Sequence, residues 1–213
     1  MRYFSAIGPA FPVMLFILGL CLVPLPTQAK DVFAVLKEQA AAMISVRSDF
    51  TQETSLPIFK DPLRSQGRFV FAKPDALLWE YLSPIQEGFV LRGNKGFRWQ
   101  DDKKNRAPFT SDSDPLAAII ARQITAWIIF DKQSIEREYR IDQLPGPVMR
   151  LKMTPLKKDV GAVIDSITIA FTPQGPASTV EITETKGGRT VISFTNTIVN
   201  APLDNGLFDL SCP

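Results

Sequence analysis

The chain has 213 residues, and its 24 basic and 22 acidic side chains leave a formal net charge of only +2. This balance gives no electrostatic case for nucleic-acid binding. Histidine is absent and only 2 cysteines occur, which excludes a Ser-His-Asp triad, a His-dependent metal site and a thiolate zinc site. We therefore expect neither a metal site nor a cofactor, and an enzyme would have to rely on isolated carboxylates or lysines.

Residues 1–29 have the pattern of a secretory signal peptide. A positive charge precedes an apolar run at 11–23, and a Pro-rich stretch then leads to the small residue Ala29. The run is shorter than the roughly 20 apolar residues that span a bilayer. We expect export, cleavage after Ala29 and one mature domain at 30–213, in which Cys212 is the remaining cysteine and has no assigned role.

An amphipathic helix is predicted at the start of the mature domain. Between Asp31 and Ile44, apolar residues such as Val32, Leu36 and Ala40 recur at the spacing of one helical face.

Large apolar and polar side chains alternate after this helix as far as Trp99, which predicts a meander of antiparallel strands. The large apolar residues of this region are Phe50, Phe69, Phe71, Leu77, Trp79, Tyr81, Phe89, Leu91, Phe97 and Trp99. Such a stripe forms either an ordinary packed core or the wall of a cavity, and the pattern alone leaves both open.

A polar loop is expected at Ala107–Asp114, followed by a second helix at Pro115–Phe130. Asp114 suits the N-cap of this helix and Pro115 its first position. Its apolar residues cover more than half of the circumference, so we expect it to be buried on two sides or to cover an apolar surface. These residues include Ile120, Ile124, Trp127 and Ile128.

Alternation resumes after the second helix and predicts about five or six further antiparallel strands. The segments are 135–141, 149–153, 163–171, 180–182, 190–194 and 207–210. The predicted fold is mainly β with helices (α+β), as a single curved antiparallel sheet or unclosed β-barrel of about ten or eleven strands.

The first half of the mature domain, about residues 30–100, resembles the family of the periplasmic lipoprotein carrier LolA in the order and spacing of its motifs. The motifs are Ser45-Val-Arg-Ser-Asp-Phe-Thr-Gln52 after the amphipathic helix, Gly67 opening a strand, Lys73-Pro74 followed by Trp79 and Pro84, and a strand-turn-strand unit that ends in Trp99. Weaker support comes from the helix at Pro115 and from Leu207-Phe-Asp-Leu210.

This resemblance implies a half-open, strongly bent sheet covered by helices that act as a lid over a hydrophobic cavity for acyl chains. The large apolar strand residues named above, from Phe50 to Trp99, would line the cavity. The lid would contribute Ile120, Ile124, Trp127 and Ile128.

The resemblance also implies a function without covalent chemistry. The protein would be a monomeric periplasmic carrier that shields the acyl chains of lipoproteins. It would receive them from an inner-membrane ABC-type transporter and pass them to an outer-membrane acceptor.

One departure from the family pattern concerns Lys73. The family typically has Arg before this proline, and the planar fork of that Arg can hold carbonyl groups of the lid segment. Lys73 keeps the charge but loses the bidentate geometry, so we expect a lid latch that is weaker or arranged differently.

The second half of the domain resembles the family only loosely, which leaves two alternatives open. One is a carrier for another lipid, a glycolipid or a polyene-type product. The other is a sensory or regulatory binding module on the same scaffold.

Overall fold

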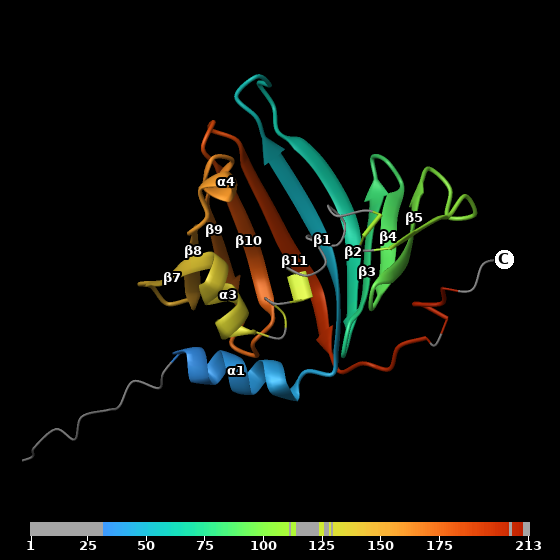
Figure 1. The fold of residues 1–213 in the computed structure, drawn as a ribbon, viewed down its shortest axis with the longest axis horizontal. Helices are drawn as coiled ribbons and strands as arrows, with labels where there is room; N and C mark the ends of the chain where they lie inside the picture. The colour runs from blue at the N-terminus through green and yellow to red at the C-terminus, as the bar shows by residue number, and fades with distance from the viewer. Residues whose placement is uncertain are drawn as a thin grey trace, which may run out of the picture.

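The computed structural model describes residues 32–110, 112–113, 124–125, 128, 130–204 and 206–210. Within them, an 11-stranded sheet with antiparallel neighbours curves around one side of the molecule and leaves the other side open (Figure 1). The strand order is β6-β5-β4-β3-β2-β1-β11-β10-β9-β8-β7. The described strands therefore form an unclosed, curved antiparallel sheet, as predicted, with β6 and β7 at its edges.

Several sequence predictions lie outside the described residues. They concern the signal peptide at 1–29, the start of the second helix at Pro115, the lid residues Ile120 and Trp127, and Cys212.

Two meanders make up the sheet and meet in its centre. The first contains β1 (Ser45–Ser55), β2 (Leu63–Ala72), β3 (Ala76–Ser83), β4 (Glu87–Arg92), β5 (Lys95–Gln100) and β6 (Ala107–Thr110). The second contains β7 (Tyr139–Leu144), β8 (Arg150–Pro155), β9 (Ile164–Phe171), β10 (Ala177–Glu184) and β11 (Arg189–Val199). The first and last strands join the two halves, because β1 pairs with β11 along most of its length.

Three helices lie wholly within the described residues. The predicted N-terminal helix is confirmed as α1 (Val32–Ala42), which crosses the end of the sheet where β1 begins and buries Leu36 and Ala40 (Figure 1). The shorter helices are α3 (Lys132–Glu138) before β7 and α4 (Lys158–Gly161) between β8 and β9. Within the described ranges, no helix is long and apolar enough to cross a bilayer.

The prediction of a polar loop at Ala107–Asp114 is wrong at its start, because Ala107–Thr110 form the strand β6. Phe109 is buried there, and Pro108 lies opposite Phe97 of β5. Proline disfavours a central strand but is tolerated at a sheet edge, where its missing N–H costs no ladder hydrogen bond.

The prediction of a strand from Ile135 onward is also wrong at its start, because residues 132–138 form the helix α3. The Asp131 side chain caps this helix, and a short amphipathic helix shares apolar positions with a strand. The final segment at 207–210 was expected to be a strand, but it forms a turn and irregular structure.

The strand register places alternate residues on an inner and an outer face. On the inner face, Phe69 lies opposite Trp79 and Phe50 opposite Phe194. The outer face carries a separate buried cluster, which the C-terminal segment covers. This outer cluster contains Val70, Leu78, Val90, Phe97 and Trp99, with Leu203, Leu207, Phe208 and Leu210 packed against it.

Gly67 of β2 leaves the space that the Phe50 ring occupies. A Cβ atom at this position would overlap that ring and the carbonyl oxygen of Glu80. We predict that Gly67→Ala lowers the free energy of unfolding by about 1–3 kcal/mol, the usual cost of overpacking, as measured by urea denaturation. Gly161→Ala is the control, since no atom lies within 4 Å of a Cβ there, and equal losses in both variants would contradict the prediction.

Protonation of Asp131 should weaken the cap of α3. Its carboxylate accepts hydrogen bonds from the hydroxyl and the N–H of Ser134, which hold the pKa of Asp131 below its ordinary value. The cap is therefore fully stabilising above the unfolded-state pKa of about 3.9 and is lost as the pH falls through the lower folded-state pKa.

We predict that Asp131→Asn, which caps at every pH, loses less stability than the wild type between about pH 5 and pH 2. Urea denaturation across this range measures the difference, with the exposed Asp112→Asn as control. Identical pH dependence for Asp131→Asn and the wild type would refute this role of the cap.

Candidate functional site

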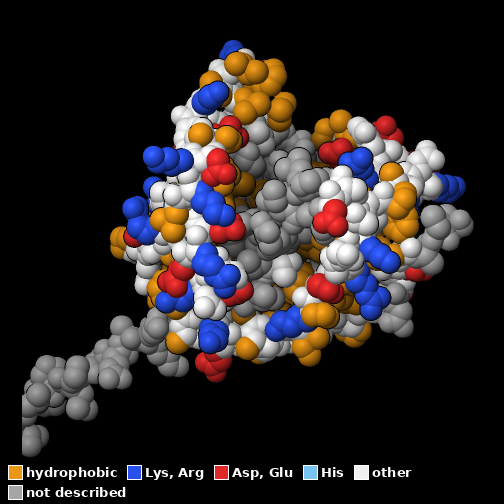
Figure 2. Space-filling view, viewed as in Figure 1, with side chains coloured by type: hydrophobic (Ala, Val, Ile, Leu, Met, Phe, Trp, Pro, Cys, Tyr) orange, Lys and Arg blue, Asp and Glu red, His pale blue; other side chains and the backbone are white. Residues whose placement is uncertain are grey.

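The inner face of the sheet surrounds a cavity of about 1400 Å³. This volume exceeds the roughly 300–1,000 Å³ of pockets for drug-sized ligands. Figure 2 shows Lys, Arg, Asp and Glu side chains on the wall that contains β7–β10 and on the wall that contains β2–β5.

Aromatic side chains form the first half of the cavity wall. Phe69, Trp79, Tyr81 and Phe89 line it from β2, β3 and β4. The Phe50 ring lies behind them, with its centroid 4.5 Å from that of Trp79, and Phe69 meets Trp79 edge to face at 5.8 Å. Interlocked rings of this kind add to the stabilisation from burial alone, so this half of the wall is held in place by its own packing.

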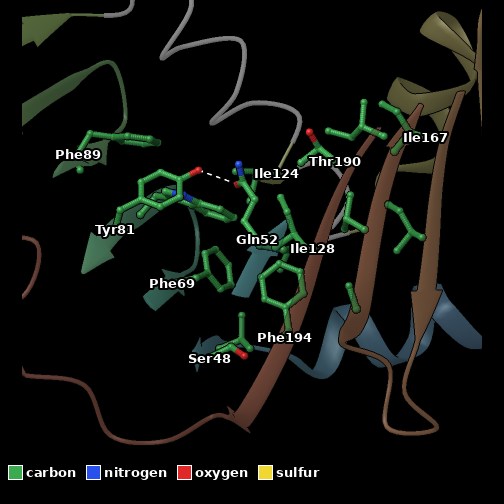
Figure 3. A pocket seen from close by; sticks show the side chains of 18 of the residues that line it. Ser48, Gln52, Phe69, Tyr81, Phe89, Ile124, Ile128, Ile167, Thr190 and Phe194 are labelled. Atoms are coloured by element: carbon green, nitrogen blue, oxygen red, sulfur yellow. Dashed lines mark hydrogen bonds between the residues drawn. The ribbon is translucent and has the colours of Figure 1, made fainter. Parts of the chain in front are cut away.

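Aliphatic side chains from the second meander form the other half. The lining residues on β9, β10 and β11 include Ile164, Ile167, Ile169, Val180, Ile182 and Ile192. Ile192 and Phe194 pack against the buried clusters of both halves, and Figure 3 shows Phe194 beside Phe69 with Ile167 on the opposite wall. The two meanders therefore build one continuous apolar surface.

The structure separates the predicted cavity residues into three groups. Phe69, Trp79, Tyr81 and Phe89 line the cavity. Phe50, Phe71, Leu77 and Leu91 belong to the same buried cluster but lie behind the lining. Phe97 and Trp99 belong to the cluster on the outer face, although Trp99 also borders the cavity.

The hairpin between β4 and β5 explains the position of Phe97 and Trp99. Arg92 pairs with Lys95, so the turn has two residues and Phe97 lies opposite Val90 on the outer face. The strand-turn-strand unit that ends in Trp99 was predicted from alternation alone, which does not set the register across the turn. A two-residue turn at a glycine was the signal that could have separated this pair from the inner-face residues.

Sequence reasoning also missed the aliphatic half of the cavity. The alternation in β9–β11 predicts strands, but it does not show which face of these strands points toward β2–β4. The pairing of β1 with β11 turns that face inward.

Two of the predicted lid residues are described, and both lie at the cavity. Ile124 and Ile128 are half-buried, line the cavity and pack against the aromatic cluster. Figure 3 shows both near Gln52.

Lys73 contacts α1. Its Nζ atom donates hydrogen bonds to the carbonyl oxygens of Ala40, at 2.8 Å, and Ala41, at 3.0 Å. These are carbonyls of the last turn of α1, where a positive charge is favourable. Lys73 therefore anchors the C-terminal end of α1 to the turn between β2 and β3.

The charged groups at the cavity are mixed in sign. Glu87, Arg98, Glu138, Lys157 and Asp159 line it, and Lys157 is 3.8 Å from Glu138. Among the described residues, no cluster of His, Cys, Asp and Glu could hold a metal ion.

Tyr81 brings a hydroxyl into the aromatic half of the wall. Burial raises the pKa of Tyr81, and the charge of Glu87 raises it further, against hydrogen bonds with Trp79 and Gln52 that lower it. The hydroxyl therefore stays neutral at physiological pH. The cavity can enclose an apolar ligand and offer it neutral hydrogen-bonding groups.

The fold and the cavity define a class of protein in which a half-open antiparallel sheet surrounds a large apolar space. Residues 42–211 match the model of the family "outer membrane lipoprotein carrier protein LolA". The match covers most of the chain, and the chain belongs to this family, as the resemblance in its first half predicted.

Two relatives carry the name outer-membrane lipoprotein carrier protein. That of Psychromonas ingrahamii is 25% identical over 182 residues, or 84% of this chain and 82% of the relative. That of Pseudoalteromonas translucida is 23% identical over 204 residues, or 94% of this chain and 91% of the relative. A solved LolA superfamily protein from Nitrosomonas europaea aligns with a TM-score of 0.44 and 9% identity, over 83% of this chain and 96% of that chain.

We predict that Lys73→Met lowers the free energy of unfolding by about 1–2 kcal/mol, because two carbonyls of α1 lose a charged donor. Lys73→Arg should lose less, since the guanidinium also donates to carbonyls. Urea denaturation measures both, with Lys60→Met on an exposed loop as control. If Lys73→Met and Lys60→Met were equally stable, Lys73 would not anchor α1.

Proposed function

We propose that this protein is a periplasmic carrier that shields the acyl chains of lipoproteins during transfer from the inner to the outer membrane. The observation that carries the proposal is the cavity of about 1400 Å³ with its aromatic and aliphatic walls. Membership of the LolA family and the names of the two relatives support the same function.

The energetics of such a cavity suit a carrier. Burial of each methylene group contributes about 0.8 kcal/mol, so ten buried methylenes contribute about 8 kcal/mol before the cost of association. Burial of methylene groups would therefore supply the main attraction for acyl chains, and their release would not require a strand pair to break. Transfer would be driven by differences in apolar contact between the carrier and its partners.

The proposal includes a cellular route. The N-terminal pattern at 1–29 predicts export, and the mature protein would then act between the two membranes. An inner-membrane ABC-type transporter would load the cavity and an outer-membrane acceptor would empty it. No chemical step is required of the carrier.

In this proposal the predicted helix at 115–130 is the lid of the cavity. Ile124 and Ile128 supply the described part of its apolar face, since they pack on the aromatic cluster that the acyl chains would contact. Loading must displace some of these contacts, which gives the lid a modest opening cost.

We predict that Ile124→Asp lowers the affinity for acyl chains at least about tenfold, because a carboxylate at this position would lose hydration when acyl chains fill the cavity. Displacement of a fluorescent acyl probe from the mature chain measures the affinity. Ile58→Asp is the matched control, since this isoleucine is 82% exposed on the loop between β1 and β2.

Two results would contradict the proposal at different levels. A wild-type chain that binds no acyl probe would refute the carrier function. Equal binding by Ile124→Asp and Ile58→Asp would refute the role of the lid and leave the cavity as the binding site.

Mass spectrometry of lipid extracted from protein purified gently from its own host distinguishes the cargo. Acylated lipoprotein supports the proposal. A glycolipid or a polyene-type product would assign the same cavity to another export system, and a lipid-free protein in a stable protein complex would favour a sensory module.

A further inference from the structure

A row of neutral hydrogen-bonding groups crosses the inner face of the sheet. The Tyr81 hydroxyl donates to Oε1 of Gln52 at 2.9 Å, as the dashed line in Figure 3 shows. Nε2 of Gln52 donates to Oγ1 of Thr54 at 3.3 Å. The hydroxyls of Thr54 and Thr190 are 3.3 Å apart. These four residues, from β3, β1 and β11, form what we call the polar row.

The polar row lies toward the end of the cavity that is far from α1. On β1 the inner-face positions begin at Val46, beside α1, pass Phe50 and reach Gln52 and Thr54 last. Figure 3 shows Phe69 and Phe194 on the side of Gln52 that leads toward α1. The part of the cavity near α1 is therefore apolar, and the part far from α1 carries neutral polar groups.

Ser48 is the other polar residue on this face of β1, and its hydrogen bonds are made within the sheet. Its hydroxyl donates to the carbonyl oxygen of Thr195 at 2.8 Å and contacts the Thr197 hydroxyl at 2.8 Å. Tyr81, Gln52 and Thr190 also border the cavity, and they keep hydrogen-bonding capacity. An amide has two N–H groups and two lone pairs, and a hydroxyl oxygen has two lone pairs, so these groups are not exhausted by the hydrogen bonds named here and the one between Trp79 and Tyr81.

The charge nearest to Tyr81 across the strand pair disfavours an anionic ligand group, although Arg98 and Lys157 also line the cavity. The four residues of the row carry no formal charge at neutral pH, and Glu87 lies directly opposite Tyr81 in the pairing of β3 with β4. A carboxylate placed there would lose hydration and meet a negative charge. An uncharged carbonyl or hydroxyl group would meet donors and acceptors of its own kind.

We propose that the polar row binds the neutral linkage between the acyl chains and the head of the cargo, an ester or amide carbonyl or a hydroxyl. Acyl chains would extend from this linkage into the apolar part of the cavity. The site would then select esterified or amidated acyl chains over free fatty acids. This inference rests on the proposed function and narrows its ligand class.

The test compares three ligands with one acyl chain: palmitate, its monoglyceride and its primary amide. Each ligand competes at neutral pH with diphenylhexatriene, an apolar probe without a polar head, for the cavity of the mature protein (30–213). We expect the monoglyceride and the amide to displace the probe at concentrations several-fold below that of palmitate.

Gln52→Leu should weaken binding of the monoglyceride and the amide by about three- to tenfold, the value of one neutral hydrogen bond. Binding of diphenylhexatriene should not change. Tyr81→Phe keeps the aromatic packing and should show the same selective loss, which guards against a Gln52→Leu variant that folds poorly. The control is Thr51→Val, an exposed threonine on the outer face of the same strand.

Each remaining outcome separates the inference from the proposed function. If neither the probe nor any ligand binds, the carrier function itself fails. If all three ligands bind equally and both variants leave them unchanged, the polar row serves only the sheet and the inference is overturned. Tighter binding of palmitate than of the amide would also overturn it.

Discussion

The pairing of β1 with β11 is the contact on which the rest of the structure depends. These strands come from opposite ends of the domain, and their register runs from Val46↔Val199 to Ser55↔Arg189. Without it, each meander would be a separate sheet with one exposed apolar face. With it, the aromatic face of β2–β4 and the aliphatic face of β9–β11 become two walls of one cavity, joined by side chains that pack against both.

The molecule has two apolar surfaces and treats them differently. The outer cluster is closed by the chain itself, since Leu207 and Phe208 of the C-terminal segment pack on it. The inner surface is larger and keeps a cavity of about 1400 Å³, with α1 across one end and Lys73 holding the last turn of that helix. The C-terminal segment thus covers the outer face of β2–β5, while the inner face lines the cavity.

A carrier has to hold its cargo and also release it. Neutral hydrogen bonds suit this requirement, because each contributes about 0.5–1.5 kcal/mol net. A buried ion pair is far more costly to break once both charges have lost their hydration. The polar row of Tyr81, Gln52, Thr54 and Thr190 can therefore orient a ligand within the cavity, while the burial of acyl chains supplies most of the affinity.

The sequence by itself determined the sheet, most of its strands, the N-terminal helix and the family, because alternation, turn residues and motif spacing are local properties of the chain. Local patterns misassigned β6, because an edge strand tolerates Pro108, and the start of β7, because the Asp131 cap favoured a helix over the alternation. Only the tertiary structure decided that Phe97 faces outward, that the aliphatic strands complete the cavity and that Lys73 contacts α1. These three features depend on the strand register and on contacts between segments far apart in sequence. A pattern with a period of two residues contains no information about either.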